Sequence, residues 1–166
     1  MTDCSRSLSV SNRHPRLRLD RAGVVRVIAE LDRSRALFRG GCPAGELSVA
    51  FMTDTQLAAL HAAYLDDPSE TDVITFEGDP SLGVAGEICV SADAAMRQSA
   101  RPSGFARELT LYLAHGWLHL AGYDDLKPAL KRTMRRAEAR ALARIEGAAG
   151  LPRFQLLKPK ERKRWL

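Results

Sequence analysis

The sequence predicts an α+β fold, with a small mixed four-stranded sheet packed against about five helices. Short β-rich runs alternate along the chain with segments of helical periodicity. Turn clusters such as residues 40–43 and 66–69 separate these segments, and no internal repeat is present. A long apolar segment, residues 105–121, is expected to form a buried helix at the centre of the fold.

Four segments are expected to form the sheet. Residues 72–76 and 87–90 are short β-rich runs bounded by glycine, proline and acidic residues. Residues 46–52 alternate weakly between polar and apolar side chains, which also indicates a strand. The fourth strand is expected near residue 8, and residues 17–19 are predicted to be a further short extended piece.

Capping residues and helical spacing mark the helices. Asp20 can cap an amphipathic helix that extends to about residue 38, and Thr53 or Asp54 can cap a second helix to about residue 64. Residues 91–100 are predicted to be helical. Another helix is expected after the central one, and its core face is predicted from apolar residues at helical spacing: Leu130, Met134, Ala137, Ala141 and Ile145.

The length and the charge distribution predict one domain with a basic end. A chain of 166 residues can bury a substantial core without disulfide or metal cross-links. The net charge is +5, but residues 1–150 carry 19 basic and 19 acidic side chains and are formally neutral. We therefore expect a single domain over residues 1–150, followed by a basic C-terminal tail at 151–166.

Several features predict a cytoplasmic protein without a membrane partner. No apolar run approaches the length of a membrane span, and residues 1–13 lack the apolar stretch of a secretory signal. Cys4, Cys42 and Cys89 are odd in number, and their spacing matches neither a zinc knuckle nor a redox pair. Reduced thiols in a reducing compartment are expected.

The predicted central helix carries a candidate metal site. His115 and His119 are four residues apart, so both imidazoles lie on one face of the helix. Gly122 can adopt the left-handed conformation that ends the helix, which lets Asp125 return toward the histidines. Such a spacing is typical of zincin-like sites, and three protein ligands leave a position open for water or substrate. The alternative is a pair of core histidines satisfied by other hydrogen-bond partners.

The ligand set predicts one divalent ion, and Zn²⁺ is the expected metal. Two histidines and a carboxylate also describe non-haem iron sites, but their spacing along one helix favours a zincin-like geometry. The residue after the first histidine is Gly116, whereas zinc peptidases of this type need a glutamate there to accept a proton from water. This difference disfavours proteolysis.

Residues 115–125 resemble the signature of the YbeY family, His-Gly-x-Leu-His-Leu-x-Gly-Tyr-Asp-His, and fit ten of its eleven positions. The resemblance covers most of residues 8–146. It includes residues 71–76, which are similar to the family's Thr-Asp-Val-Leu-Ser-Phe strand, and residues 86–88, which are similar to its Gly-Asp-Ile. It extends to residues 107–109, upstream of His115, and to Met134 and Glu138, downstream of the metal-binding residues.

The chain departs from this family at two places. Asp125 stands where the family has a third metal-binding histidine, which keeps a ligand but adds a negative charge. The family's Asn and Arg before the Thr-Asp-Val strand correspond here to His61 and Leu65. An arginine thought to contact phosphate is therefore absent at that position.

The resemblance implies a metal-dependent single-strand endoribonuclease that acts in 16S rRNA 3′-end maturation and ribosome quality control. Its implied partners are ribosomal RNA, the small ribosomal subunit, and a ribosomal or GTPase protein. No side chain is predicted to be the catalytic group, because water activated by the ion can supply the nucleophile. Two alternatives stay open: a non-catalytic ribosome-associated assembly factor with a structural metal, and a zincin-like metallopeptidase.

A basic surface is the candidate RNA contact. On the last predicted helix, the basic residues lie opposite the apolar face, and the tail adds further cations. The alternative is a solvated face that aids solubility. The candidate residues are Arg132, Arg135, Arg136, Lys160, Arg162, Lys163 and Arg164.

Three other side chains near the predicted site have alternative roles. Glu108 could support the metal site from two turns before His115, or it could form a simple ion pair. His61 could approach the site or lie on a helix surface. Trp165 could stack on an RNA base or pack on the domain.

Overall fold

A mixed four-stranded sheet forms the base of the fold in the computed structural model, which describes residues 6–65 and 71–160, with only the backbone of residue 65. Its strand order is β1-β3-β5-β4. Strands β1, β3 and β5 are parallel, and β4 is antiparallel to β5. The strands are β1 Leu8–Asn12, β3 Glu46–Met52, β4 Val73–Glu77 and β5 Val84–Ser91. The predicted α+β fold with a mixed sheet is confirmed.

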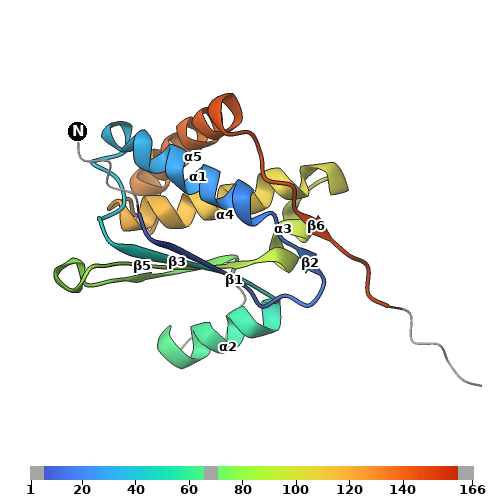
Figure 1. Ribbon diagram of the computed structural model, residues 1–166. Helices are drawn as coiled ribbons and strands as arrows, with labels where there is room; N and C mark the ends of the chain where they lie inside the picture. The colour runs from blue at the N-terminus through green and yellow to red at the C-terminus, as the bar shows by residue number, and fades with distance from the viewer. Residues whose placement is uncertain (1–5, 66–70, 161–166) are drawn as a thin grey trace, which may run out of the picture.

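Five α-helices surround this sheet within the described part of the chain. Figure 1 shows α1, α4 and α5 over one face of the sheet and α2 alone against the other. Two separate apolar clusters fill the two interfaces, the larger one beneath α1, α4 and α5. The helices are α1 Arg21–Arg33, α2 Asp54–Leu65, α3 Ala92–Gln98, α4 Phe105–Leu120 and α5 Pro128–Ala148.

The first helix is shorter than predicted. Asp20 caps α1 as expected, accepting a hydrogen bond from the backbone N–H of Gly23 at 2.9 Å. The helix ends at Arg33, however, and a short 3-10 turn (Arg35–Leu37) follows it. Phe38 then turns inward and is fully buried, so the chain leaves the helix axis to place this ring in the core.

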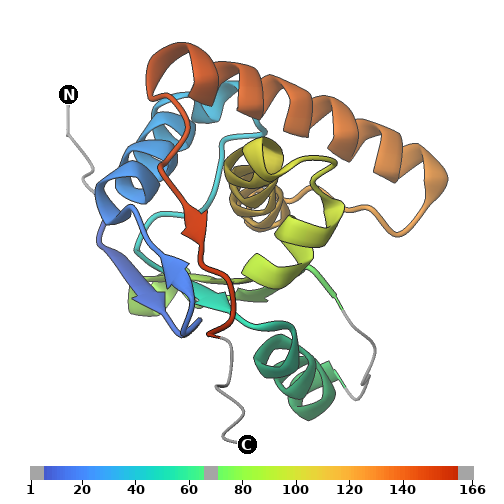
Figure 2. The same ribbon diagram turned by 90° about the vertical axis from the view of Figure 1, so that its right-hand side faces the viewer.

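Part of the predicted C-terminal tail is attached to the domain. Strand β6 (Gln155–Leu156) pairs antiparallel with β2 (Leu17–Arg18), and Figure 2 shows the two strands side by side. The Phe154 ring is buried against Phe51, with their centroids 5.5 Å apart. The backbone N–H of Arg153 also donates to the Asp20 carboxylate at 2.8 Å. Residues 153–156 therefore belong to the folded body.

Helix α4 lies directly on the sheet because Gly116 has no side chain. A Cβ atom at this position would lie 2.5 Å from Cγ2 of Ile88 on β5 and 3.2 Å from Cγ2 of Thr75 on β4. Trp117 and Leu118, the next two residues, are fully buried. The glycine thus sets the close approach that holds the two predicted metal-binding histidines above the β4 side of the sheet.

Within the described residues, no helix is both long enough and apolar enough to span a membrane.

Candidate metal centre

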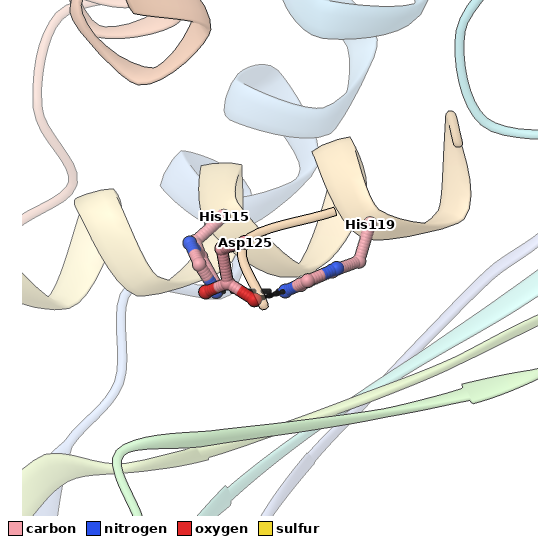
Figure 3. Close-up of side chains that lie close together, drawn as sticks. All are labelled: His115, His119 and Asp125. Atoms are coloured by element: carbon pink, nitrogen blue, oxygen red, sulfur yellow. Dashed lines mark hydrogen bonds and ion pairs between the residues drawn. The ribbon is translucent and has the colours of Figure 1, made fainter. Parts of the chain in front are cut away.

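The structure brings the three predicted ligands together. Figure 3 shows His115 and His119 projecting from α4 and Asp125 returning to them from the following loop. The two Nε2 atoms are 3.0 Å apart, and each lies 3.6 Å from a carboxylate oxygen of Asp125. One ligand atom from each residue fits within a group no more than 4.8 Å across. A single ion can therefore contact all three side chains.

The partners of the two imidazoles fix which nitrogen points inward. Nδ1 of His115 lies 2.6 Å from the Glu138 carboxylate, and Nδ1 of His119 lies 2.9 Å from the carbonyl oxygen of Tyr123. Both partners are acceptors, so each neutral ring carries its proton on Nδ1. The Nε2 lone pairs then converge with the Asp125 carboxylate. Converging lone pairs fit a cation, so these residues suit the ion that the ligand spacing predicts.

The turn that carries Asp125 forms as the sequence predicts. Gly122 has a φ of 99°, and its N–H donates to the carbonyl of His119 at 3.0 Å. Oδ1 of Asp124 then accepts from the backbone N–H groups of Asp125 and Leu126, at 2.6 and 3.1 Å. This side-chain turn sets the direction in which the Asp125 carboxylate leaves the backbone.

The site is half-buried and remains open to solvent. The exposed fractions of the side chains are 21% for His115, 25% for His119 and 31% for Asp125. Burial lowers the pKa of His119, and neighbouring His115 lowers it further. A neutral His119 is the form that can bind a metal ion, so its environment favours ligation at neutral pH.

A shallow hollow adjoins the histidines on the β4 side. Thr75 and Glu77 of β4 contribute to its wall, facing His119 and the turn after α4. Neither residue was predicted to be near the site, because strand alternation identifies the two faces of β4 but not the helix that covers each. The residues that line the hollow are Thr75, Glu77, His119, Leu120, Gly122, Tyr123 and Asp124.

Glu138, and not Glu108, is the carboxylate that contacts His115; support of the site is one of the two roles predicted for Glu108. Glu138 projects from α5, and the exposed fraction of its side chain is 18%. Glu108 lies instead beside the buried Tyr112, whose pKa is raised by burial and by the carboxylates of Asp72 and Glu108. Helical spacing could not identify Glu138, because it lies 23 residues after His115 and approaches only through the packing of α5 on α4.

Gly116 has no room for the glutamate that a peptidase of this type needs. The residue after the first histidine faces the sheet, where a Cβ would already clash with Ile88. A longer acidic side chain would require α4 to move away from β5. The packing thus gives a physical reason for the absence of that general base.

The predicted RNA-binding residues are only partly described. Arg132, Arg135 and Arg136 are exposed on α5, and Lys160 is exposed after β6. Arg162, Lys163, Arg164 and Trp165 lie outside the described residues, as does the side chain of Leu65. RNA binding by these residues stays a prediction.

The two remaining histidines lie elsewhere. His61 is in α2, on the opposite face of the sheet from α4. His14 is 3% exposed, and its Nε2 lies 2.7 Å from the Asp93 carboxylate. Its Nδ1 accepts from the backbone N–H of Arg16 at 3.0 Å. Both ring nitrogens of His14 are therefore engaged in structural hydrogen bonds.

Together, the fold and the site define an α+β protein with two histidines and one carboxylate arranged to hold a metal ion on a helix and its following turn. The chain belongs to the family of Endoribonuclease YbeY, whose family profile matches residues 12–146. The Endoribonuclease YbeY of Salinibacter ruber is 33% identical over 141 residues, covering 79% of this chain and 87% of the relative. That of an Anaeromyxobacter species is 34% identical over 152 residues, covering 87% and 74%.

The fold is also similar to a solved structure, the solution structure of TM1509 from Thermotoga maritima. The TM-score is 0.57 at 20% sequence identity, and the match covers 84% of this chain and 89% of the other. This likeness supports the fold, and the role in RNA cleavage follows from the family.

Proposed function

We propose that this protein is a metal-dependent, single-strand-specific endoribonuclease that acts in 16S rRNA 3′-end maturation and ribosome quality control. Its proposed partners are ribosomal RNA and the small ribosomal subunit in the cytoplasm, with a ribosomal or GTPase protein as a further partner. Membership of an endoribonuclease family supports RNA cleavage. Metal dependence is supported by one observation: the Nε2 lone pairs of His115 and His119 converge with the Asp125 carboxylate at one half-buried site that is open to solvent.

His115, His119 and Asp125 would hold the ion, which we propose to be Zn²⁺. A divalent ion at such a site polarises a phosphate oxygen and lowers the pKa of water toward neutrality. Glu138 and the Tyr123 carbonyl keep the imidazole protons on Nδ1, so that both Nε2 atoms face the ion. The Asp125 carboxylate gives this chain one more negative charge than a three-histidine site would have.

The open side of the site suits an RNA strand. The hollow beside β4 reaches His119, and its wall carries the Thr75 hydroxyl and the Glu77 carboxylate. The carboxylate repels phosphate, so at Glu77 the strand would have to present hydrogen-bond donors of its ribose or bases. On α5, Arg132, Arg135 and Arg136 could contact the RNA backbone. Contacts of this kind supply salt-dependent affinity with little sequence choice, so the choice of cleavage site would come from the assembling ribosome.

Cleavage of a structured RNA fragment would test the proposal. His115→Ala should abolish metal-dependent cutting while circular dichroism shows an unchanged fold, because the core is formed by other residues. His61→Ala is the matched control, since it removes a histidine from the opposite face of the sheet. Cutting that persists in the His115 variant would indicate a contaminating nuclease and would contradict the proposal.

A non-catalytic assembly factor is the second candidate, favoured by two departures from the family pattern: Asp125 replaces a histidine, and Leu65 replaces an arginine. It predicts that metal removal unfolds the domain, and that the metal-bound protein binds ribosomes but cuts no RNA. The endoribonuclease proposal predicts that the metal-free domain stays folded and loses only cutting. A peptidase is third, and the packing of Gly116 against β5 disfavours it.

A further inference from the structure

Arg39 adopts a backbone conformation that arginine rarely takes. Its φ is 55°, and it is the only non-glycine residue with a positive φ in the described part of the chain. The next two residues are Gly40 and Gly41, with φ of 87° and 82°. Glycine would adopt this conformation at lower cost, so an arginine here indicates a use for its side chain.

The side chain of Arg39 reaches the turn that follows the metal helix. Its Nη1 donates to the carbonyl oxygen of Gly122 at 3.2 Å. Its guanidinium also lies over the ring of Tyr123, 4.1 Å from the ring centroid. The Tyr123 ring is 5% exposed and anchored in the core, and its carbonyl oxygen is the partner of His119 Nδ1. One side chain therefore contacts two consecutive residues between His119 and Asp125.

The segment that carries Arg39 is itself fixed to α4. Phe38 is fully buried, edge-on to Trp117, with their ring centroids 5.7 Å apart. Gly41 lies close to the same indole, since a Cβ there would be 3.1 Å from Trp117 Cζ2. Trp117 lies between His115 and His119 in the sequence, so Arg39 extends from a base that is rigid relative to the two histidines.

The other hydrogen bonds of the turn are local. Gly122 and Tyr123 donate to the carbonyls of His119 and Leu118, and Asp124 accepts from the two residues that follow it. Among the residues that the structure describes, Arg39 supplies the hydrogen bond that ties this turn to a distant part of the chain.

We propose that Arg39 is a positioning residue for the metal site, acting through the Gly122–Tyr123 backbone to hold Asp125 against the two histidines. This inference rests on the proposed metal binding. The left-handed backbone of Arg39 directs its side chain toward the turn. The guanidinium then donates to the carbonyl of Gly122 and packs on the buried ring of Tyr123, which holds the turn at two points. The third ligand is then preorganised before an ion arrives.

Arg39→Ala should lower the affinity for Zn²⁺ about tenfold, as expected when a partner that orients the ligands is lost. Affinity is measured by competition with a chromophoric chelator. Hydrogen exchange of the backbone amides at residues 122–126 in the metal-free protein should become faster. Arg140→Ala is the matched control, because Arg140 is also an exposed arginine over an aromatic ring, 5.6 Å from the centroid of Phe38. Within the described part of the chain Arg140 packs over Phe38 and not on the turn, so its removal should leave both measurements unchanged.

Arg39→Gly separates positioning from general stability. Glycine relieves the positive φ but loses the same two contacts as alanine, so the midpoint of urea unfolding for the metal-free protein should fall less than in Arg39→Ala, while Zn²⁺ affinity should drop about tenfold in both variants. Wild-type Zn²⁺ affinity and slow exchange at residues 122–126 in both Arg39 variants would overturn the positioning role. If the wild type bound no Zn²⁺, the proposed function would fail instead, and the exchange measurement would still report whether Arg39 orders the turn.

Discussion

Gly116→Ala tests whether α4 packs on the sheet as closely as the structure shows. The new methyl group would start 2.5 Å from Cγ2 of Ile88, about 1 Å inside a normal carbon contact, and 3.2 Å from Cγ2 of Thr75. Overpacking of this kind costs about 1–3 kcal/mol, and the higher helix propensity of alanine returns about 1 kcal/mol. The free energy of unfolding should therefore fall by about 0–2 kcal/mol.

Gly147→Ala is the matched substitution. Gly147 is also helical, but no atom lies within 4 Å of a Cβ built there, so the change should stabilise the protein by up to about 1 kcal/mol. The two variants should differ by about 1–3 kcal/mol in urea unfolding, with Tm shifts of about 2–4 °C per kcal/mol. If Gly116→Ala were as stable as Gly147→Ala, the reasoning about helix packing would be refuted.

Three further predictions address the site, the attached C-terminal segment and the basic surface. Glu138→Gln keeps the size of the side chain but removes its negative charge beside His115. The affinity for Zn²⁺, measured by chelator competition, should therefore fall about 10-fold or more. Unchanged affinity would contradict the role of Glu138 in orienting His115. Asp20→Ala should cost about 1–2 kcal/mol in urea unfolding. The N–H groups of Arg153 and Gly23 lower the pKa of Asp20 below 3.8, so this contribution is present above pH 3.8 and is lost as the pH falls through the lowered pKa. A cost that persisted undiminished in strong acid would contradict that account. Replacing Arg132, Arg135 and Arg136 with alanine should weaken RNA binding and reduce the slope of log K against log salt by about 2, and an unchanged slope would indicate a merely solvated face.

Much of the fold follows from local patterns in the sequence. Strand alternation and turn residues predict the four strands, and the capping role of Asp20 is confirmed by its hydrogen bond to Gly23. The end of α1 was predicted incorrectly because helical periodicity continues past Arg33 as far as Phe38. There the burial of the Phe38 ring against Trp117 overrides the local preference.

The core of the candidate site also follows from the sequence, because it lies within one helix and its turn. His115, His119 and Asp125 lie within a segment of eleven residues, and helical geometry with a left-handed Gly122 brings them together. Glu138 and Arg39 could not be identified as partners of the site in the same way. Both approach from other elements, and their positions depend on how α5 and the turn after α1 pack on α4.

Metal content is the most direct test of the central claim. Elemental analysis should find about one equivalent of metal in the purified wild-type protein, and the metal should be lost in His119→Ala and Asp125→Ala variants that circular dichroism shows to be folded. Absence of metal from the wild type, even after reconstitution with Zn²⁺, would reduce the two histidines to partly buried structural residues and contradict the account.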